Sequence, residues 1–315
     1  MPNQLGHSTK SKTIVVGCPA PYNLLTMALY RKQHFLPAAY LRYFSDDQKS
    51  CTRDSRFWSF DGEKMGRVSV ESQCFENYYY SKTRAKEVED SFRRKEILYC
   101  ERADTVRKEG KIPAEYRTGF ILLMVDFALR NGIHKNKTGR EGISAYHDRL
   151  SMFFEVLLLE KQGQRITNPE ILLHIDTYWR LEIISAPAAS QFATSDNPAV
   201  FCSFEEPTGE WTPIQVILLP IDPYHVAFAF DSRFLSVPNN FANFQDLIVM
   251  NHLQFANAAR AVYVASAFSE GDLVELRQLF TTKRNSICEV TNEGWRTVKQ
   301  CIPPQHNFSF VSLLP

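Results

Sequence analysis

Long apolar runs, paired cysteines and an excess of charge are all missing from this sequence of 315 residues. No continuous apolar segment reaches the roughly 18 residues that a transmembrane helix needs, so no membrane span is predicted. The seven cysteines are odd in number and form no Cys-x-x-Cys pair, which argues against a disulfide framework and against a zinc knuckle. Reduced thiols in a cytoplasmic protein are therefore expected.

The formal net charge is only +1, so the chain as a whole does not attract nucleic acid or an anionic membrane surface. A local basic groove is compatible with this balance, and the partner stays unknown. The sequence also lacks the Walker A, Gly-x-Gly-x-x-Gly, Gly-x-Ser-x-Gly and His-Glu-x-x-His motifs. Neither a cofactor nor a metal can be assigned from these absences.

What is present is an ordinary globular balance, with 44 % apolar and 23 % charged residues. Strand-like stretches at 56–60 and 67–70 flank an Asp-Gly step, which predicts a hairpin. Helical patterns follow at 82–110, 114–134, 143–162 and 168–175, and strand patterns from 178 to 230. Helix returns at 241–259. Because helices and strands are segregated, we predict an α+β fold, in which an N-terminal hairpin and helical region pack against a mixed, mainly antiparallel sheet.

The same pattern predicts one intertwined domain, because the helical half alone would expose too much apolar surface. We place that domain at residues 31–285 and expect an N-terminal extension at 1–30. Residues 286–315 are expected to form an irregular C-terminal tail.

Two short stretches stand out as places where chemistry could reside. His34 precedes Pro37 and a short helical pattern at residues 37–44. It could act as a general base, because histidine titrates near neutral pH, or it could pin the segment through a hydrogen bond. Asp196 and Asn197 lie between two predicted strands, ahead of Pro198. They could lock a turn, or they could present a carboxylate at a strand end.

Glu89 lies on the charged helix, and Arg130 closes the most apolar one. The two could form a buried ion pair between helices, or they could belong to a site. A metal ion would need two neighbouring carboxylates, which only Asp196 together with Glu89 or Glu87 could supply.

The sequence resembles the mainly bacterial DUF4238 family of proteins of unknown function. The resemblance rests on His-Phe-Leu-Pro at 34–37 with Tyr-Leu and Phe-Ser after it, on Thr-Ser-Asp-Asn-Pro at 194–198, and on Ile-Leu-Leu-Pro at 217–220. It covers about residues 32–280 and leaves the first 30 outside. Because the family has no known activity, the resemblance implies a set of characteristic positions but no reaction. These positions are His34, Pro37, Glu89, Arg130, Asp196, Asn197 and Pro220.

We therefore hypothesise that His34, Arg130, Asp196 and Asn197 approach one another in a cleft, with Glu89 as a further candidate catalytic residue. One interpretation is a hydrolase, such as a nuclease of a bacterial defence or toxin system, because these residue types suit phosphodiester chemistry. The alternative is a non-catalytic interaction module, in which the same residues form a structural hydrogen-bond network. An Arg130 at the mouth of an exposed cleft would favour the enzyme, and full burial would favour the network.

Overall fold

The structure, a computed structural model, describes most of the chain between residue 32 and residue 314. The described ranges are 32–46, 54–77, 79, 85–130, 168–203, 214–274, 276–278, 299–301 and 308–314. Within them, no helix is both long enough and apolar enough to cross a membrane. The predicted helix at 143–162 and the expected extension at 1–30 lie outside the described residues.

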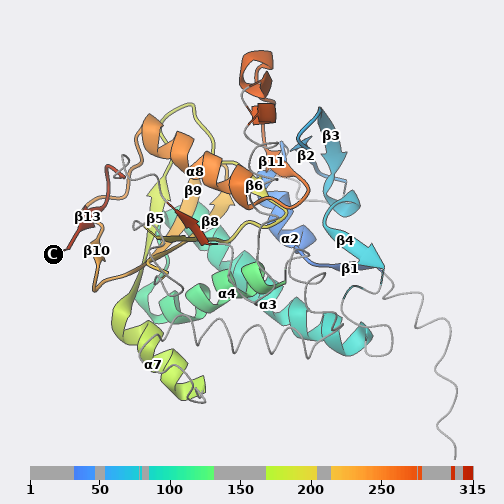
Figure 1. Cartoon of the computed structure of the whole chain (residues 1–315). Helices are drawn as coiled ribbons and strands as arrows, with labels where there is room; N and C mark the ends of the chain where they lie inside the picture. The colour runs from blue at the N-terminus through green and yellow to red at the C-terminus, as the bar shows by residue number, and fades with distance from the viewer. Residues whose placement is uncertain are drawn as a thin grey trace, which may run out of the picture.

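The described helices confirm the predicted positions (Figure 1). Their bounds are Ala38–Leu41 for α2, Ala85–Glu109 for α3, Arg117–Leu129 for α4, Asn168–Tyr178 for α7 and Phe244–Asn257 for α8, with short 3-10 turns at Arg42–Phe44, Val70–Ser72 and Ala114–Tyr116. Gly110 ends α3, as its position predicted. Its φ of 67° is left-handed, and its N–H donates to the carbonyl of Val106 at 2.7 Å.

The main sheet has five strands in the order β12-β7-β8-β9-β5. They are β5 (Trp179–Ser185), β7 (Val200–Ser203), β8 (Val216–Asp222), β9 (His225–Asp231) and β12 (Lys299–Cys301). All neighbouring pairs are antiparallel except β12 with β7. The sheet is therefore mixed and mainly antiparallel, and the fold is α+β, as the sequence predicted.

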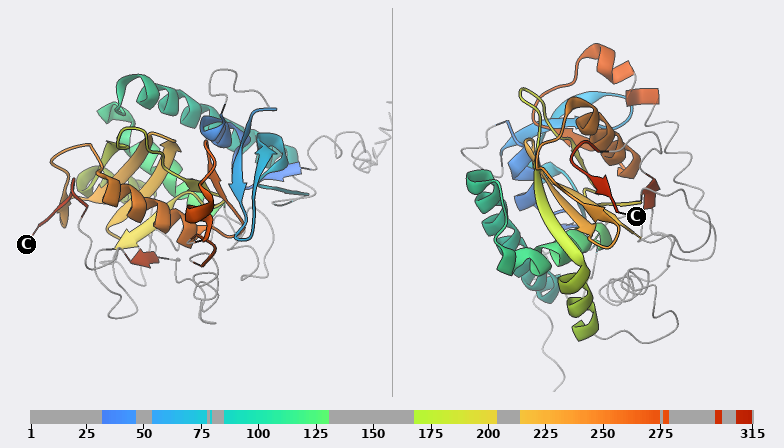
Figure 2. Two further views of the ribbon diagram at one scale, coloured as in Figure 1. Left: turned by 90° about the horizontal axis from the view of Figure 1, so that it is seen from above. Right: turned by 90° about the vertical axis from the view of Figure 1, so that its left-hand side faces the viewer.

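The two faces of this sheet are covered by different helices (Figure 2). Ile217 and Leu219 of β8 belong to the core cluster that contains side chains of α3 and α4. Val216 and Leu218 belong to the cluster that contains side chains of α8. Since successive strand residues point to opposite faces, a strand covered on both sides must be apolar throughout, which explains the unbroken apolar run in β8.

A second sheet has the order β3-β2-β11-β6 and is fully antiparallel. Its strands are β2 (Arg56–Phe60), β3 (Met65–Ser69), β6 (Thr194–Ser195) and β11 (Val262–Val264). The predicted hairpin is β2–β3, whose turn has Gly62 at φ 96°. A two-stranded ribbon joins β1 (Lys32–His34) to β4 (Phe75–Asn77). This ribbon brings His34 toward α3 and α4.

The described part of the C-terminal segment differs from the irregular tail that was expected. β12 pairs with β7, and β13 (Ser312–Leu313) pairs with β10 (Leu235–Ser236). Phe308 and Phe310 are buried, and the ring of Phe310 lies 5.2 Å from that of Phe228. Burial of these two aromatic rings on the α8 side of the sheet is what holds the segment against the fold.

Candidate functional site

Arg130 joins three separate elements. Its guanidinium is only 2 % exposed, and Nη2 donates to the backbone carbonyl of His34 at 3.3 Å and to the carboxylate of Glu96 at 3.1 Å. The planar group lies over the ring of Phe92, 3.9 Å from its centroid. The hydroxyl of Tyr79 donates to the Arg130 carbonyl at 3.1 Å. Arg130 thus ties the end of α4 to α3 and to β1.

A second carboxylate lies on the other side of the guanidinium. Asp126, one helical turn before Arg130, has an oxygen 4.0 Å from Nη1 and is itself buried. Lys95 of α3 donates to the other oxygen of Asp126 at 2.5 Å. A buried charge is tolerated only with a partner of opposite sign. Lys95, Asp126, Arg130 and Glu96 meet this condition as a series of alternating charges between α3 and α4.

Glu89 lies two helical turns before Glu96 and therefore on the same side of α3. Partial burial raises the pKa of its carboxyl to about 7, and the negative charge of Glu96 adds to the effect, while Arg130 opposes it. A carboxyl group with this pKa is part protonated and part ionised at neutral pH, which suits a proton donor or acceptor.

The imidazole of His34 is partly buried beside the ring of Phe75, with centroids 5.7 Å apart. Burial lowers its pKa below the ordinary histidine value, and the positive charges of Arg130 and Lys32 act in the same direction, against Glu96. Its Nε2 atom is buried and has no hydrogen-bond partner within the described ranges. His34 is therefore a neutral imidazole at physiological pH, with one nitrogen uncommitted.

These contacts bring three of the five predicted site residues into one place. We call His34, Glu89, Glu96 and Arg130 the Arg130 cluster. Arg130 does not lie at the mouth of a cleft, because it is buried and engaged by its neighbours. The other three members, His34, Glu89 and Glu96, are partly exposed.

Asp196 and Asn197 belong to a different set of contacts, at the end of α8. The Asp196 carboxylate accepts the backbone N–H of Ala259 at 2.9 Å, and its own N–H donates to the carbonyl of Ala261 at 3.1 Å. Burial raises the pKa of this carboxyl to about 6, although the backbone N–H groups and the charge of Arg260 oppose the shift. The expected lock was a bond to a nearby backbone N–H, and the carboxylate instead bonds to the distant segment that follows α8.

Asn197 and its neighbours are bound by a row of amide side chains on α8. Asn257 donates to the carbonyls of Asn197 at 2.7 Å and Ala199 at 3.1 Å, and the Asn197 amide returns a bond to the Asn257 carbonyl at 3.2 Å. One turn earlier, Gln254 accepts from Ser195 and donates to the carbonyl of Pro198 at 2.7 Å. Since Asn197 is only 5 % exposed, this is a buried polar network.

The hydrogen bonds place the predicted residues in two sets. The carbonyl of His34 accepts from Arg130, and the Asp196 carboxylate accepts from Ala259. The two sets approach each other at Arg260, which is ion-paired with Glu76 on β4 and whose guanidinium lies 5.4 Å from the ring centroid of Phe35, the residue after His34.

Sequence reasoning missed Glu96 and Asp126. Their spacing could have identified both. Glu96 follows Glu89 by two helical turns, and Asp126 precedes Arg130 by one turn, so each pair lies on one side of its helix. In the described ranges, no three His, Cys, Asp or Glu side chains gather in a way that could hold a metal ion. Glu89 and Asp196, the two carboxylates considered for a metal, lie in different sets of contacts.

Comparison with known protein families gives a match over residues 32–268 of the 315 to the model described as "Protein of unknown function (DUF4238)". The match confirms the resemblance and begins at β1, which carries His34. Searches of curated proteins and of solved structures gave no match.

Proposed function

We propose that this chain, which belongs to the DUF4238 family, is a hydrolase in which Glu89 and His34 move protons. The observation that carries the proposal is the carboxyl of Glu89, whose pKa of about 7 results from partial burial beside Glu96. Perturbed titration in a partly exposed group is typical of catalytic acids and bases. His34, whose backbone carbonyl accepts from Arg130, adds a neutral imidazole with an uncommitted nitrogen.

The chemistry needs one proton acceptor and one proton donor. Neutral His34 accepts a proton from water at Nε2 as the water oxygen attacks the substrate, a step that requires substrate binding to open access to this buried atom. Protonated Glu89 gives its proton to the departing oxygen, so the bond to the leaving group breaks without releasing an unprotonated alkoxide. Arg130 and Glu96 position the two groups, because Arg130 holds the backbone of His34 and pairs with the helix that carries Glu89.

The substrate class in this proposal is a phosphodiester, and its specific form is a nuclease of a bacterial defence or toxin system. Lys32 supports an anionic substrate, since it is exposed on the same strand as His34 and lies 4.6 Å from the ring centroid of Phe75. A cytoplasmic setting is part of the proposal and is supported by the free thiols of Cys74 and Cys100.

Two observations favour the non-catalytic alternative for part of the site. Arg130 is buried and does not lie at the mouth of a cleft. Asp196 and Asn197 are buried and bound to the end of α8 and the turn after it, although Oδ2 of Asp196 and Oδ1 of Asn197 have no hydrogen-bond partner within the described ranges. We therefore assign these two residues a positioning role for α8 and β11, and we leave the proton transfers to Glu89 and His34. A non-catalytic binding module would need only the positioning role of Asp196 and Asn197 and no proton transfer.

The test compares Glu89→Gln and His34→Asn with Glu101→Gln, a control on the same helix whose carboxylate is mostly exposed. Hydrolysis of bis(p-nitrophenyl) phosphate and of single- and double-stranded nucleic acids is followed from pH 5 to 9. We expect losses of about a hundredfold for the first two variants and none for the control. The rate of the wild-type protein should change near pH 7, where Glu89 titrates.

The proposal fails if the wild-type protein cleaves none of these substrates, or if Glu89→Gln keeps the rate and pH profile of the wild type. Expression in bacterial cells tests the defence or toxin form. Growth should slow with the wild-type chain and recover with Glu89→Gln at equal protein level. Equal growth with both chains rejects the toxin form.

A further inference from the structure

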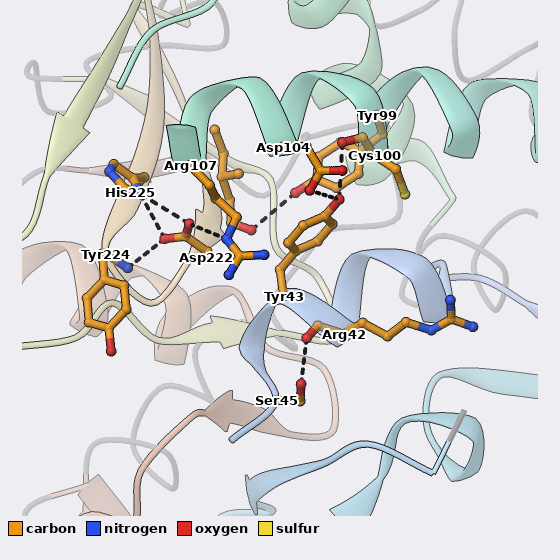
Figure 3. Close-up of polar contacts among 11 residues, drawn as sticks. Arg42, Tyr43, Ser45, Tyr99, Cys100, Asp104, Arg107, Asp222, Tyr224 and His225 are labelled. Atoms are coloured by element: carbon orange, nitrogen blue, oxygen red, sulfur yellow. Dashed lines mark hydrogen bonds and ion pairs between the residues drawn. The ribbon is translucent and has the colours of Figure 1, made fainter. Parts of the chain in front are cut away.

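A second group of side chains, distinct from the Arg130 cluster, lies where β8 turns into β9 (Figure 3). Asp222 is 1 % exposed and accepts from Nδ1 of His225, with 3.0 Å to one carboxylate oxygen and 3.1 Å to the other. The backbone N–H of Tyr224 donates to Asp222 at 2.7 Å. Nε of Arg107, from the last turn of α3, lies 3.7 Å from the same carboxylate.

The contact with Asp222 determines which nitrogen of His225 is reactive. A carboxylate can only accept hydrogen bonds, so Nδ1 carries the proton that is shared with it. Nε2 then holds a lone pair. The His225 side chain is 20 % exposed, so this nitrogen belongs to a ring that solvent can reach. A buried carboxylate that orients an imidazole in this way is the arrangement that makes histidine an effective general base.

An irregularity in β8 places Asp222 on the same side of the sheet as His225. The pairing with β9 shifts register between Pro220 and Asp222. Proline has no N–H to donate to a neighbouring strand. The Pro220 carbonyl accepts a hydrogen bond from the hydroxyl of Tyr40 at 2.7 Å. A shift of one residue moves the following side chain to the other face. Asp222 is thereby opposite His225 and faces α3 rather than α8.

Ser185 is the neighbour of His225 on the other side. The two residues are directly paired between β5 and β9, so their side chains share a face, with Cβ atoms about 4.5–5.5 Å apart. The backbone of Ser185 is engaged, since its N–H donates to Asn240 at 2.9 Å and its carbonyl accepts from Ala242 at 3.0 Å. Its side chain is partly exposed, and within the described ranges its hydroxyl makes no hydrogen bond.

From this row of side chains across three strands we propose that Ser185 is a nucleophile, with His225 as its general base and Asp222 as the positioning residue. The Ser185 oxygen attacks the carbonyl carbon of an ester, and its proton passes to Nε2 of His225. The proton then goes to the departing alkoxide as the ester C–O bond breaks. Water, deprotonated by His225, cleaves the acyl-serine, releases the acid and returns the proton to Ser185.

The substrate class is an ester with an apolar or aromatic acyl group. Two residues next to the row, one in sequence and one by backbone pairing, carry aromatic side chains that are exposed to solvent. Tyr224, 52 % exposed, precedes His225, and Phe241, 70 % exposed, forms an isolated bridge with Ser185. Apolar rings of this kind favour apolar or aromatic substituents over charged ones.

The test uses a fluorophosphonate probe on the full chain, followed by peptide mass spectrometry. In the wild-type protein the Ser185 oxygen should displace fluoride from phosphorus and remain labelled. Ser185→Ala should abolish that label, and His225→Gln should slow it by about a hundredfold. Ser190→Ala is the matched control, since Ser190 lies in the exposed segment that follows β5, its hydroxyl bonds to the carbonyl of Ala188, and its loss should leave labelling unchanged.

Asp222→Asn tests the positioning role. An amide can donate to Nδ1, so the variant should favour the opposite tautomer of His225 and lose labelling in parallel. Imidazole ¹⁵N spectra read the tautomer directly and also report whether the variant is folded. For the wild-type protein they should show the proton on Nδ1.

Three results would overturn the inference: no label on Ser185, equal labelling of the wild type and a folded His225→Gln variant, or a wild-type proton on Nε2. Hydrolysis of p-nitrophenyl butyrate should be lost with Ser185→Ala and kept with Ser190→Ala. Because Glu89→Gln is scored separately, on bis(p-nitrophenyl) phosphate, failure of one proposal can be distinguished from failure of the other.

Discussion

Arg130 donates to the backbone carbonyl of His34 at 3.3 Å, although the two residues are 96 positions apart in the sequence. The bond joins the first described strand to the end of α4, the most apolar helix. The guanidinium also faces the carboxylates of Glu96 and Asp126. Arg130 is therefore central to how β1, α3 and α4 are held together, whatever reaction the chain performs.

Replacing Arg130 with methionine should destabilise the protein by about 3–5 kcal/mol, because Asp126 and Glu96 would lose a buried partner. Arg117→Met is the matched control. Arg117 pairs with Asp176, whose side chain is 69 % exposed, so its loss should cost less than about 1 kcal/mol. Urea denaturation monitored by tryptophan fluorescence measures both variants. Equal losses would contradict the central role of Arg130.

The stability of the protein should fall as pH rises from about 4.5 to about 7, in part because of Glu89. Its pKa is 4.5 in the unfolded chain and about 7 in the folded one, so the folded protein binds the additional proton. Stabilisation from that proton is complete below pH 4.5 and is lost as pH rises through 7. Glu89→Gln should flatten this slope and Glu101→Gln should not, as measured by urea denaturation at several pH values. An unchanged slope with Glu89→Gln would argue against the raised pKa.

Local pattern was sufficient to predict much of the fold. A few neighbouring residues are enough to predict each of three features: the apolar strands β8 and β9, the hairpin at the Asp-Gly step, and the end of α3 at Gly110. In each case the local preference agrees with the final packing, because both faces of β8 and β9 are covered. This is why the α+β class could be predicted from the sequence.

The grouping of the site residues could not be predicted, because it depends on contacts between distant parts of the chain. His34 and Arg130 come together only when the β1–β4 ribbon lies against α3 and α4. Asp196 is directed toward the end of α8 by bonds to Ala259 and Ala261. The pairing of Asp222 with His225 depends on a register shift, for which Pro220 is the sole local sign.

Asp196 gives a prediction with two opposite outcomes at one position. Asp196→Ala removes the acceptor for the Ala259 N–H and should cost about 1–3 kcal/mol. Asp196→Asn keeps an oxygen acceptor and removes a buried negative charge. Burial raises the pKa of Asp196 to about 6 in the folded protein, so the folded state holds the proton more tightly than the unfolded chain does. The free energy of unfolding of the wild-type protein therefore falls as pH rises from about 3.8 through 6. The asparagine variant should therefore equal or exceed wild-type stability at pH 7.5.

Thermal unfolding at pH 5 and pH 7.5 distinguishes these outcomes. The gain from Asp196→Asn over the wild type should be larger at the higher pH. If Asp196→Asn instead destabilises the protein as much as Asp196→Ala at pH 7.5, the carboxylate has a favourable role as an anion. That result would return Asp196 to the list of candidate catalytic residues.

The amide row on α8 predicts an uneven response along one helix. Asn257→Ala would leave the carbonyls of Asn197 and Ala199 without the amide that now donates to them, at a cost of roughly 1–3 kcal/mol. Gln245→Ala, on the exposed side of α8, should cost less than about 0.5 kcal/mol.

Hydrogen exchange adds a local measurement. Asn257→Ala should speed exchange of the Asp196 N–H, which donates to Ala261, more than exchange within β9. Uniform acceleration throughout the protein would mean that the turn opens only with global unfolding, and the amide row would then not be a separate local lock.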